Sequence, residues 1–220
     1  MGGRGASCSL GRSSLKQFQK MNSQQLNNFA NDLRGMDYND LVNQGLNGNN
    51  PLQRLVDKLN LHEKPVVLDD DAFDKMVSDN NMLQIYRGVY GNRYLSSDDV
   101  VKHTMYANKT YVGDGIHGDG LYFSTDPTTA KVYGSSRMTA VINPNKAKII
   151  TESKLDNMMR NDPNYSPNVF RDKSQYALYK GYNVIQAVGG NGGISHANGG
   201  EDYYIPLDRS ALIFRKNSKI

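Results

Sequence analysis

The chain has 220 residues, of which 38% are hydrophobic and 22% charged, and its formal net charge is +4 at pH 7. This length and composition are typical of a globular protein with one domain, or one domain and an appendage, and a core of its own. No apolar run approaches the ~20 residues of a membrane-spanning helix, and the N-terminus lacks an apolar signal-peptide core. We therefore expect a cytoplasmic protein that has no membrane partner.

Metal and nucleic-acid binding are not supported by the sequence. The four histidines lack metal-ligand spacing, and Cys8 is the only cysteine, which excludes an intramolecular disulfide and a cysteine metal cluster. Basic residues gather at both ends, but the lysines are scattered and no basic-aromatic array is present. We expect no metal and no nucleic-acid partner.

The first third of the chain is predicted to be helical. Residues 1–13 are rich in Gly, Ser and Arg and are expected to form a disordered tail. Residues 14–80 form the expected helical region, because apolar side chains recur there at helical spacing. Its predicted helices cover 23–34, 38–44, a segment starting at Pro51, and 70–78. This region carries no catalytic pattern.

From residue 81 to 220 short strands dominate, and the order of helices followed by strands predicts an α+β fold. Segments with β-branched and aromatic residues, which favour strands, are separated here by turn residues. Predicted strands cover 83–90, 121–123, 138–142, 147–151, 183–188, 201–207 and 210–215. Predicted helices cover 97–106 with Ser97 as N-cap, a segment starting at Pro127, 152–160 and 174–180.

The stretch 118–134, Gly-Asp-Gly-Leu-Tyr-Phe-Ser-Thr-Asp-Pro-Thr-Thr-Ala-Lys-Val-Tyr-Gly, combines a glycine loop, a short strand and a helix start. Asp126 before Pro127 is an N-cap acid followed by proline at the first helical position, and Gly134 is a stop signal. A hydroxyl-rich turn at a helix N-terminus suits a ligand that carries phosphate or ribose.

Two further pieces flank this stretch. Arg87-Gly88 places a guanidinium and a glycine inside a predicted strand. The loop 189–200 contains six glycines and ends directly before Glu201, which opens another predicted strand. An arginine strand, an aromatic-serine strand and a glutamate after a glycine loop, in this order, resemble the ADP-ribosyltransferase family over residues 83–215.

The resemblance is to two branches of that family at once. The central stretch is similar to the poly(ADP-ribose) polymerase branch, in which Gly-x-Gly-Ile-Tyr-Phe is followed by a small residue and a tyrosine. It implies that Tyr122 is the tyrosine of a His-Tyr-Glu triad, that Tyr133 stacks on nicotinamide, and that Ala130 replaces a serine. Arg87 in place of the histidine, and Ser124-Thr125, instead resemble the toxin-like Arg-Ser-Glu branch.

The family's fold is a split pair of β-sheets with NAD in the cleft, preceded by a helical region. The resemblance implies three catalytic residues, Glu201, Ser124 and Arg87. The implied NAD-binding residues are Arg87, Gly88, Tyr122, Ser124, Thr125 and Tyr133. A carboxylate near the ribose stabilises the positive charge that develops when the nicotinamide bond breaks, and a guanidinium fork matches a diphosphate.

The resemblance implies a mono-ADP-ribosyltransferase that uses NAD as co-substrate and a protein as acceptor, without a metal. Chain elongation is not expected, because an arginine replaces the triad's histidine. The glycine-rich start also resembles bacteriophage proteins, which would place the enzyme in a bacterial host's cytoplasm, acting on a host or defence protein. The alternatives are an NAD glycohydrolase and an inactive NAD-binding or interaction module associated with phage particles.

The acceptor is expected to be a residue other than arginine. Arginine-modifying relatives carry an acid two positions before the catalytic glutamate, and this chain has Gly199 there. Asp202 is expected to point to the opposite side of the strand from Glu201 and so to be a poor replacement. We expect the loop 189–200 and the helical region to select the acceptor protein.

Overall fold

The computed structural model describes residues 64–91, 93, 95–106, 115–118, 120–163, 165, 167, 170, 172–189 and 202–217. The expected tail, the expected helices before residue 64, most of the loop 189–200 and Glu201 lie outside them. The described strands are β1 (Val66–Leu68), β2 (Gln84–Val89), β3 (Phe123–Ser124), β4 (Ser136–Ile142), β5 (Ile149–Thr151), β6 (Val184–Ala187), β7 (Tyr203–Pro206) and β8 (Leu212–Arg215). The described α-helices are α5 (Asp70–Asp79), α6 (Ser97–Tyr106), α7 (Pro127–Val132), α8 (Glu152–Asn161) and α9 (Lys173–Tyr179), and the 3-10 helix η1 covers Arg209–Ala211.

The described strands form one eight-stranded mixed sheet in the order β1-β8-β4-β2-β3-β7-β6-β5. The β1–β8 and β5–β6 pairs are parallel, and the other pairs are antiparallel. The short strand β3 joins the two halves, with Ser124 opposite Tyr86 on one side and Tyr203 on the other. The expected division into two sheets is therefore not seen in the hydrogen bonding of these strands.

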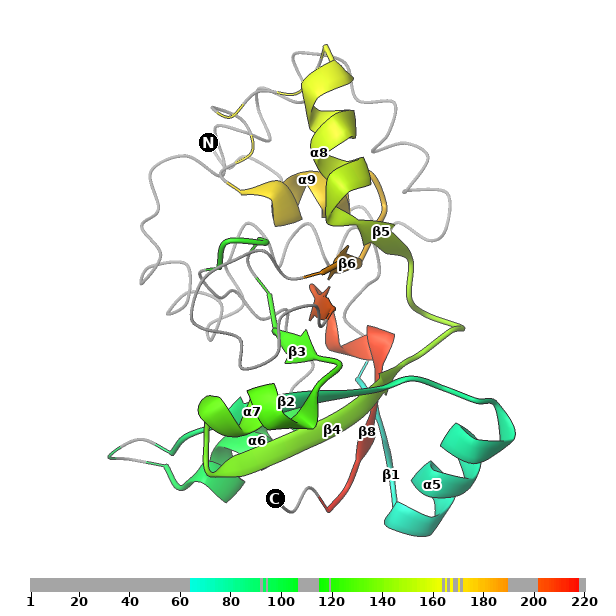
Figure 1. Ribbon diagram of the computed structural model, residues 1–220, viewed down its shortest axis with the longest axis vertical. Coiled ribbons are helices and arrows are strands. Elements are labelled where there is room, and N and C mark those ends of the chain that lie inside the picture. The colour runs from blue at the N-terminus through cyan, green and yellow to red at the C-terminus, as the bar shows by residue number, and fades with distance from the viewer. Residues whose placement is uncertain are drawn as a thin grey trace, which may run out of the picture.

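The two larger hydrophobic cores lie in different halves of the sheet, and a third, smaller one contains Phe73 of α5, Val141 and Ile213. Figure 1 shows α8 and α9 beside β5 and β6, and α5, α6 and α7 around the half that contains β2, β4 and β8. The first core includes Ile150, Leu155, Phe170, Tyr176, Ile185 and Ile205. The second core includes Ile85, Val101, Met105, Phe123, Met138 and Phe214. The narrow strand β3 thus lies at the boundary between two separately packed units.

Local capping chemistry explains where the helices begin. Asp126 accepts a hydrogen bond from the Thr128 backbone N–H at 2.8 Å and caps α7, as the sequence predicted. The predicted cap of α6 is wrong by one residue. The Ser96 hydroxyl accepts from the Asp99 N–H at 3.1 Å, whereas the Ser97 hydroxyl accepts from the Gly91 N–H. Two adjacent serines offer the same capping chemistry, so the sequence did not distinguish them.

Three strands differ from the expectation, and one of them is the strand predicted over 210–215, which begins at Leu212 because Arg209–Ala211 form η1. β1 lies in the range expected to be helical, and it forms because Val66 to Leu68 pair with β8 from the other end of the chain. The predicted strand 121–123 is observed as β3, Phe123–Ser124. The Tyr122 carbonyl accepts a hydrogen bond from the Arg87 side chain, and the pairing of β3 with β2 is limited to Ser124. No helix in the described ranges is both long and apolar enough to cross a membrane.

Candidate functional site

A cavity of about 400 Å³ opens where β2 and β3 separate. This volume lies within the range of small-molecule sites. Its walls come from β2, α6, the segment before β3, α7 and β7. The lining residues are Tyr86, Arg87, Gly88, Val89, Tyr90, Val100, Gly120, Tyr122, Ser124, Thr129, Ala130, Tyr133 and Tyr203. Five of the seven residues implied by the sequence resemblance therefore line one cavity.

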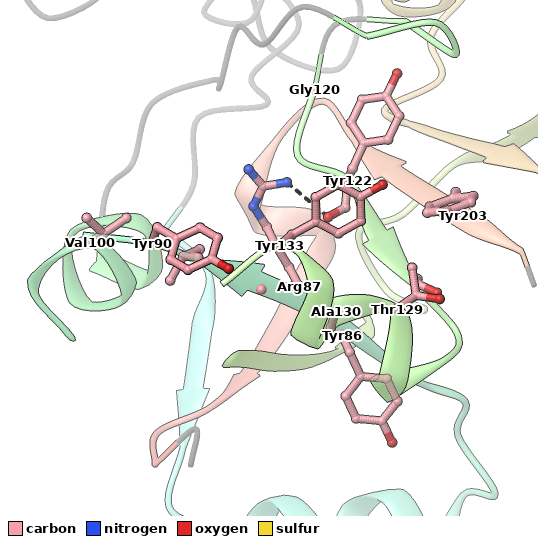
Figure 2. Close-up of a pocket in the computed structure, with 13 residues that line it drawn as sticks. Tyr86, Arg87, Tyr90, Val100, Gly120, Tyr122, Thr129, Ala130, Tyr133 and Tyr203 are labelled. Carbon is pink, nitrogen blue, oxygen red and sulfur yellow. Dashed lines mark hydrogen bonds between the residues drawn. The ribbon is translucent and has the colours of Figure 1, made fainter. Parts of the chain in front are cut away.

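Arg87 bridges the gap between the two strands. Its Nη1 donates a hydrogen bond to the Tyr122 carbonyl oxygen at 3.1 Å. Figure 2 shows the Arg87 side chain directed from β2 toward Tyr122, whereas the Tyr86 ring points the other way. The Tyr86 ring instead lies under the Arg137 guanidinium, 5.3 Å from its central carbon. The hydrogen bond to the Tyr122 carbonyl engages one of the five N–H donors of the Arg87 guanidinium and orients this planar group at the cavity wall.

Gly88 allows the backbone of α7 to pack directly on β2. A Cβ at this position would lie 1.8 Å from the Ala130 carbonyl oxygen. Gly134 has the reciprocal role, since a Cβ there would lie 2.1 Å from the Val89 carbonyl carbon. Both glycines therefore have a packing reason of their own, and this close approach brings α7 and Tyr133 to the cavity.

Ser124 and Thr125 turn the chain from β3 into α7. The buried Ser124 hydroxyl accepts from the Asp126 backbone N–H at 3.0 Å. The Thr125 N–H donates to the Asp202 carbonyl at 3.0 Å, and the Asp202 N–H donates to the Thr125 hydroxyl at 3.2 Å. Thr125 does not line the cavity. Its reciprocal pair of hydrogen bonds instead fixes the start of β7 against the end of β3.

The Asp202 carboxylate is used within the fold. Its Oδ2 accepts from the Gln186 side-chain amide at 2.9 Å, and its Oδ1 accepts from the Gly189 N–H at 3.0 Å. These bonds hold both oxygens toward β6 and the turn that follows it. Glu201, which precedes Asp202 in the chain, lies outside the described residues, so its predicted role stays a prediction.

The two predicted tyrosines are held differently. The Tyr122 hydroxyl donates to the Gly118 carbonyl at 2.7 Å and accepts from the His117 N–H at 2.9 Å, so the hydroxyl end of its ring is fixed by two hydrogen bonds. Tyr133 is the C-cap residue of α7 and is 42% exposed, which leaves its ring open at the cavity mouth. The sequence analysis missed the other wall residues, among them Tyr90, Val100, Thr129 and Tyr203.

The sequence analysis also missed a half-buried charge cluster behind the cavity, in which Glu152 is central. Glu152 accepts from His117 Nδ1 at 2.7 Å and from Lys173 Nζ at 2.5 Å. Lys173 Nζ lies 3.3 Å from Asp156. Burial alone would raise the pKa of the Glu152 carboxyl, but the hydrogen bonds from Lys173 and His117 outweigh burial and lower it. Glu152 is therefore an ionised hydrogen-bond acceptor.

Comparison with known proteins adds no identification, since no protein-family model, curated protein or solved structure matches the chain. Within the described ranges, no group of three or more His, Cys, Asp or Glu side chains is placed to hold a metal ion. The arguments about function therefore rest on the cavity and on the residues that form it.

Proposed function

We propose that the chain is a mono-ADP-ribosyltransferase that cleaves the nicotinamide–ribose bond of NAD and transfers ADP-ribose to a protein. In this reaction nicotinamide leaves with the electron pair of the broken bond. A nucleophilic side chain of the acceptor forms the new bond to the ribose carbon and loses a proton. The proposal requires a site that binds a dinucleotide, encloses nicotinamide and places a carboxylate near the ribose.

The observation that carries the proposal is the convergence of separated residues on one cavity. Arg87, Tyr122, Ser124 and Tyr133 were selected from sequence order and motif alone, and all four line it. Purely structural roles, such as an ion pair at a sheet edge or aromatic packing in a core, would not require these residues to share a cavity. A volume of about 400 Å³ suits the nicotinamide ribose with part of the diphosphate.

In the proposal, different walls of the cavity bind the diphosphate, the nicotinamide ring and the carboxamide of NAD. Arg87 offers a charged fork for the diphosphate, and its bond to the Tyr122 carbonyl fixes the direction of that fork. Aromatic side chains of Tyr122, Tyr133 and Tyr203 surround a space in which a flat pyridine ring can stack. The Gly88 backbone lies at the same wall and supplies amide groups for the carboxamide.

In the proposal, Glu201 supplies the carboxylate. It is bonded to Asp202, whose backbone is fixed to Thr125 beside Ser124. In the proposal, the Glu201 carboxylate lies near the ribose and stabilises the positive charge that develops there as the nicotinamide–ribose bond breaks. Ser124 supports the ribose or the glutamate. The two separately packed halves of the sheet, with the cavity at the junction, correspond in this proposal to the family's two sheets.

The proposed acceptor is a residue other than arginine, in a host or defence protein if the chain comes from a bacteriophage. The two oxygens of Asp202 already accept hydrogen bonds from Gln186 and Gly189, which supports the view that Asp202 does not orient an acceptor guanidinium. The proposed place of action is the cytoplasm of the bacterial host. The loop 189–200 and the helical region are proposed to bind the acceptor protein.

The test is to incubate the full chain with NAD labelled in its adenine ring, with and without a bacterial lysate. We expect protein-bound label that mass spectrometry maps to a side chain other than arginine. Nicotinamide release with no labelled protein would instead identify a glycohydrolase. The absence of both release and label would identify an inactive module and would overturn the proposal.

A further inference from the structure

A histidine that the proposed reaction does not use lies directly behind the cavity. The His117 ring stacks on Tyr203 with the ring centroids 6.1 Å apart and the planes 20° apart. The same ring is 6.2 Å from the Tyr122 ring. The His117 backbone N–H also donates to the Tyr122 hydroxyl at 2.9 Å. One residue therefore contacts two of the aromatic side chains that wall the cavity.

The side chain of His117 is fixed from the other side by α8 and α9. Glu152 is the first residue of α8 and Lys173 is the first residue of α9. Both helices lie beside the half of the sheet that contains β5 and β6 (Figure 1). Because the ionised Glu152 only accepts hydrogen bonds, the 2.7 Å contact means that His117 Nδ1 carries the hydrogen and donates it. The His117 and Glu152 side chains are 12% and 21% exposed, so solvent screens their contact only in part.

The backbone around His117 leaves little room for adjustment. Gly118 has φ of 109°, a conformation that side-chain-bearing residues rarely adopt, and a Cβ there would lie 2.4 Å from the Ser174 hydroxyl. A Cβ at Gly115 would lie 2.1 Å from the Tyr122 hydroxyl. The segment Gly115-Ile116-His117-Gly118 therefore encloses the Tyr122 hydroxyl with backbone groups, and Glu152 holds this segment in place through His117.

We infer that His117 is a positioning residue for the proposed reaction. Through its hydrogen bond to Glu152 it sets where the Tyr122 and Tyr203 rings stand, and so sets the alignment of nicotinamide in the cavity. The effect on catalysis rests on the proposed function. The effect on the two rings does not, because it follows from contacts within the protein.

Two variants separate positioning from simple packing. His117→Asn keeps an N–H that can reach Glu152 but lacks the ring, whereas His117→Phe keeps a ring but has no donor. We expect His117→Ala and His117→Phe to lower kcat for NAD cleavage by about 10-fold or more, with KM changed by less than about threefold. His117→Asn should recover most of kcat. Recovery by Phe and not by Asn would overturn the inference.

A second readout does not depend on activity. In protein labelled with ¹³C-tyrosine, the NMR signals of the Tyr122 and Tyr203 rings are assigned from Tyr122→Phe and Tyr203→Phe. His117→Ala should shift both signals, and the control Arg160→Ala, which removes an exposed side-chain hydrogen bond within α8, should shift neither. Unchanged ring signals in His117→Ala would overturn the inference. If these signals shift but the wild-type protein does not cleave NAD, only the proposed function is overturned.

Discussion

At the scale of single residues, Arg87 is the charged side chain among the described residues that line the cavity. Its guanidinium projects from β2 and donates to the Tyr122 carbonyl, across the gap between β2 and β3. This hydrogen bond links the guanidinium to the peptide group that follows Tyr122, so Arg87 and the Tyr122 backbone are held together at the cavity wall.

Replacing Arg87 should weaken the binding of NAD. Arg87→Ala removes charged hydrogen bonds to the diphosphate, so we expect a loss of about 1.5–3 kcal/mol in binding free energy, measured by calorimetry. Arg87→Lys should recover only part of it, because lysine lacks the planar fork. Arg160→Ala is the matched control, since Arg160 is exposed on α8 and bonds to its own helix. Equal NAD affinities for wild type and Arg87→Ala would assign Arg87 a purely structural role.

The places of single residues in the fold could be predicted from the sequence where a short local motif marks them. The Asp126 cap and the cavity residues Arg87 and Tyr133 follow from short motifs. The contact between His117 and Glu152 was not predictable, because the two residues are 35 positions apart and neither lies in a recognisable pattern. Their contact depends on how the segment before β3 packs against α8, which only the folded chain defines.

At the scale of elements, α7 packs directly on β2 at the site. Gly88→Ala would place a Cβ 1.8 Å from the Ala130 carbonyl oxygen, so α7 must move. We expect a loss of about 1–3 kcal/mol in the free energy of unfolding, measured by urea denaturation. Lys131→Ala, on the exposed side of α7, should stay within about 0.5 kcal/mol of wild type. Equal stability of wild type and Gly88→Ala would show that this contact is not as close as described.

Glu152 at the start of α8 should make stability depend on pH. Its folded-state pKa is lowered, so the carboxylate stabilises the fold above its ordinary pKa of 4.5, and this contribution is lost as pH falls through the folded-state pKa. Glu152→Gln does not titrate. We expect it to cost about 1.5–3 kcal/mol near pH 7 and to reduce the loss of stability between about pH 6 and pH 3, measured by urea unfolding. Asp79→Asn, which breaks an exposed ion pair, is the control and should change neither quantity measurably. An acid loss as large in Glu152→Gln as in wild type would contradict this assignment.

Elements were predictable where local signals act, as with the hydrophobic spacing of α5 and the Asp126 cap of α7. The strand β1 was not, because Val66–Leu68 is too short to show a period and gains its partner from β8. The extent of β3 was also missed, because Phe123–Ser124 is defined by its pairing with β2 and β7, which come from distant parts of the chain. Both cases involve tertiary contacts that override the local pattern.

At the scale of the whole molecule, the two cores meet at the cavity. Ser124, Tyr122 and Tyr203 lie where the half with β2 and β4 joins the half with β5 and β6. The β2 half contributes Arg87 and Gly88, and the other half contributes Tyr203 of β7, two positions after the predicted Glu201. The proposed reaction therefore uses groups from both halves, and any change in how the halves are joined should alter catalysis.

The most direct measurement of the central claim is nicotinamide release from NAD by the purified full chain with a bacterial lysate, for wild type and Glu201→Gln. We predict release by wild type and a rate at least about 10²-fold lower for Glu201→Gln, because the carboxylate acts on the charge of the transition state. Calorimetry should show that the variant still binds NAD. Release by a folded Glu201→Gln variant at the wild-type rate, or no release by wild type, would contradict the account.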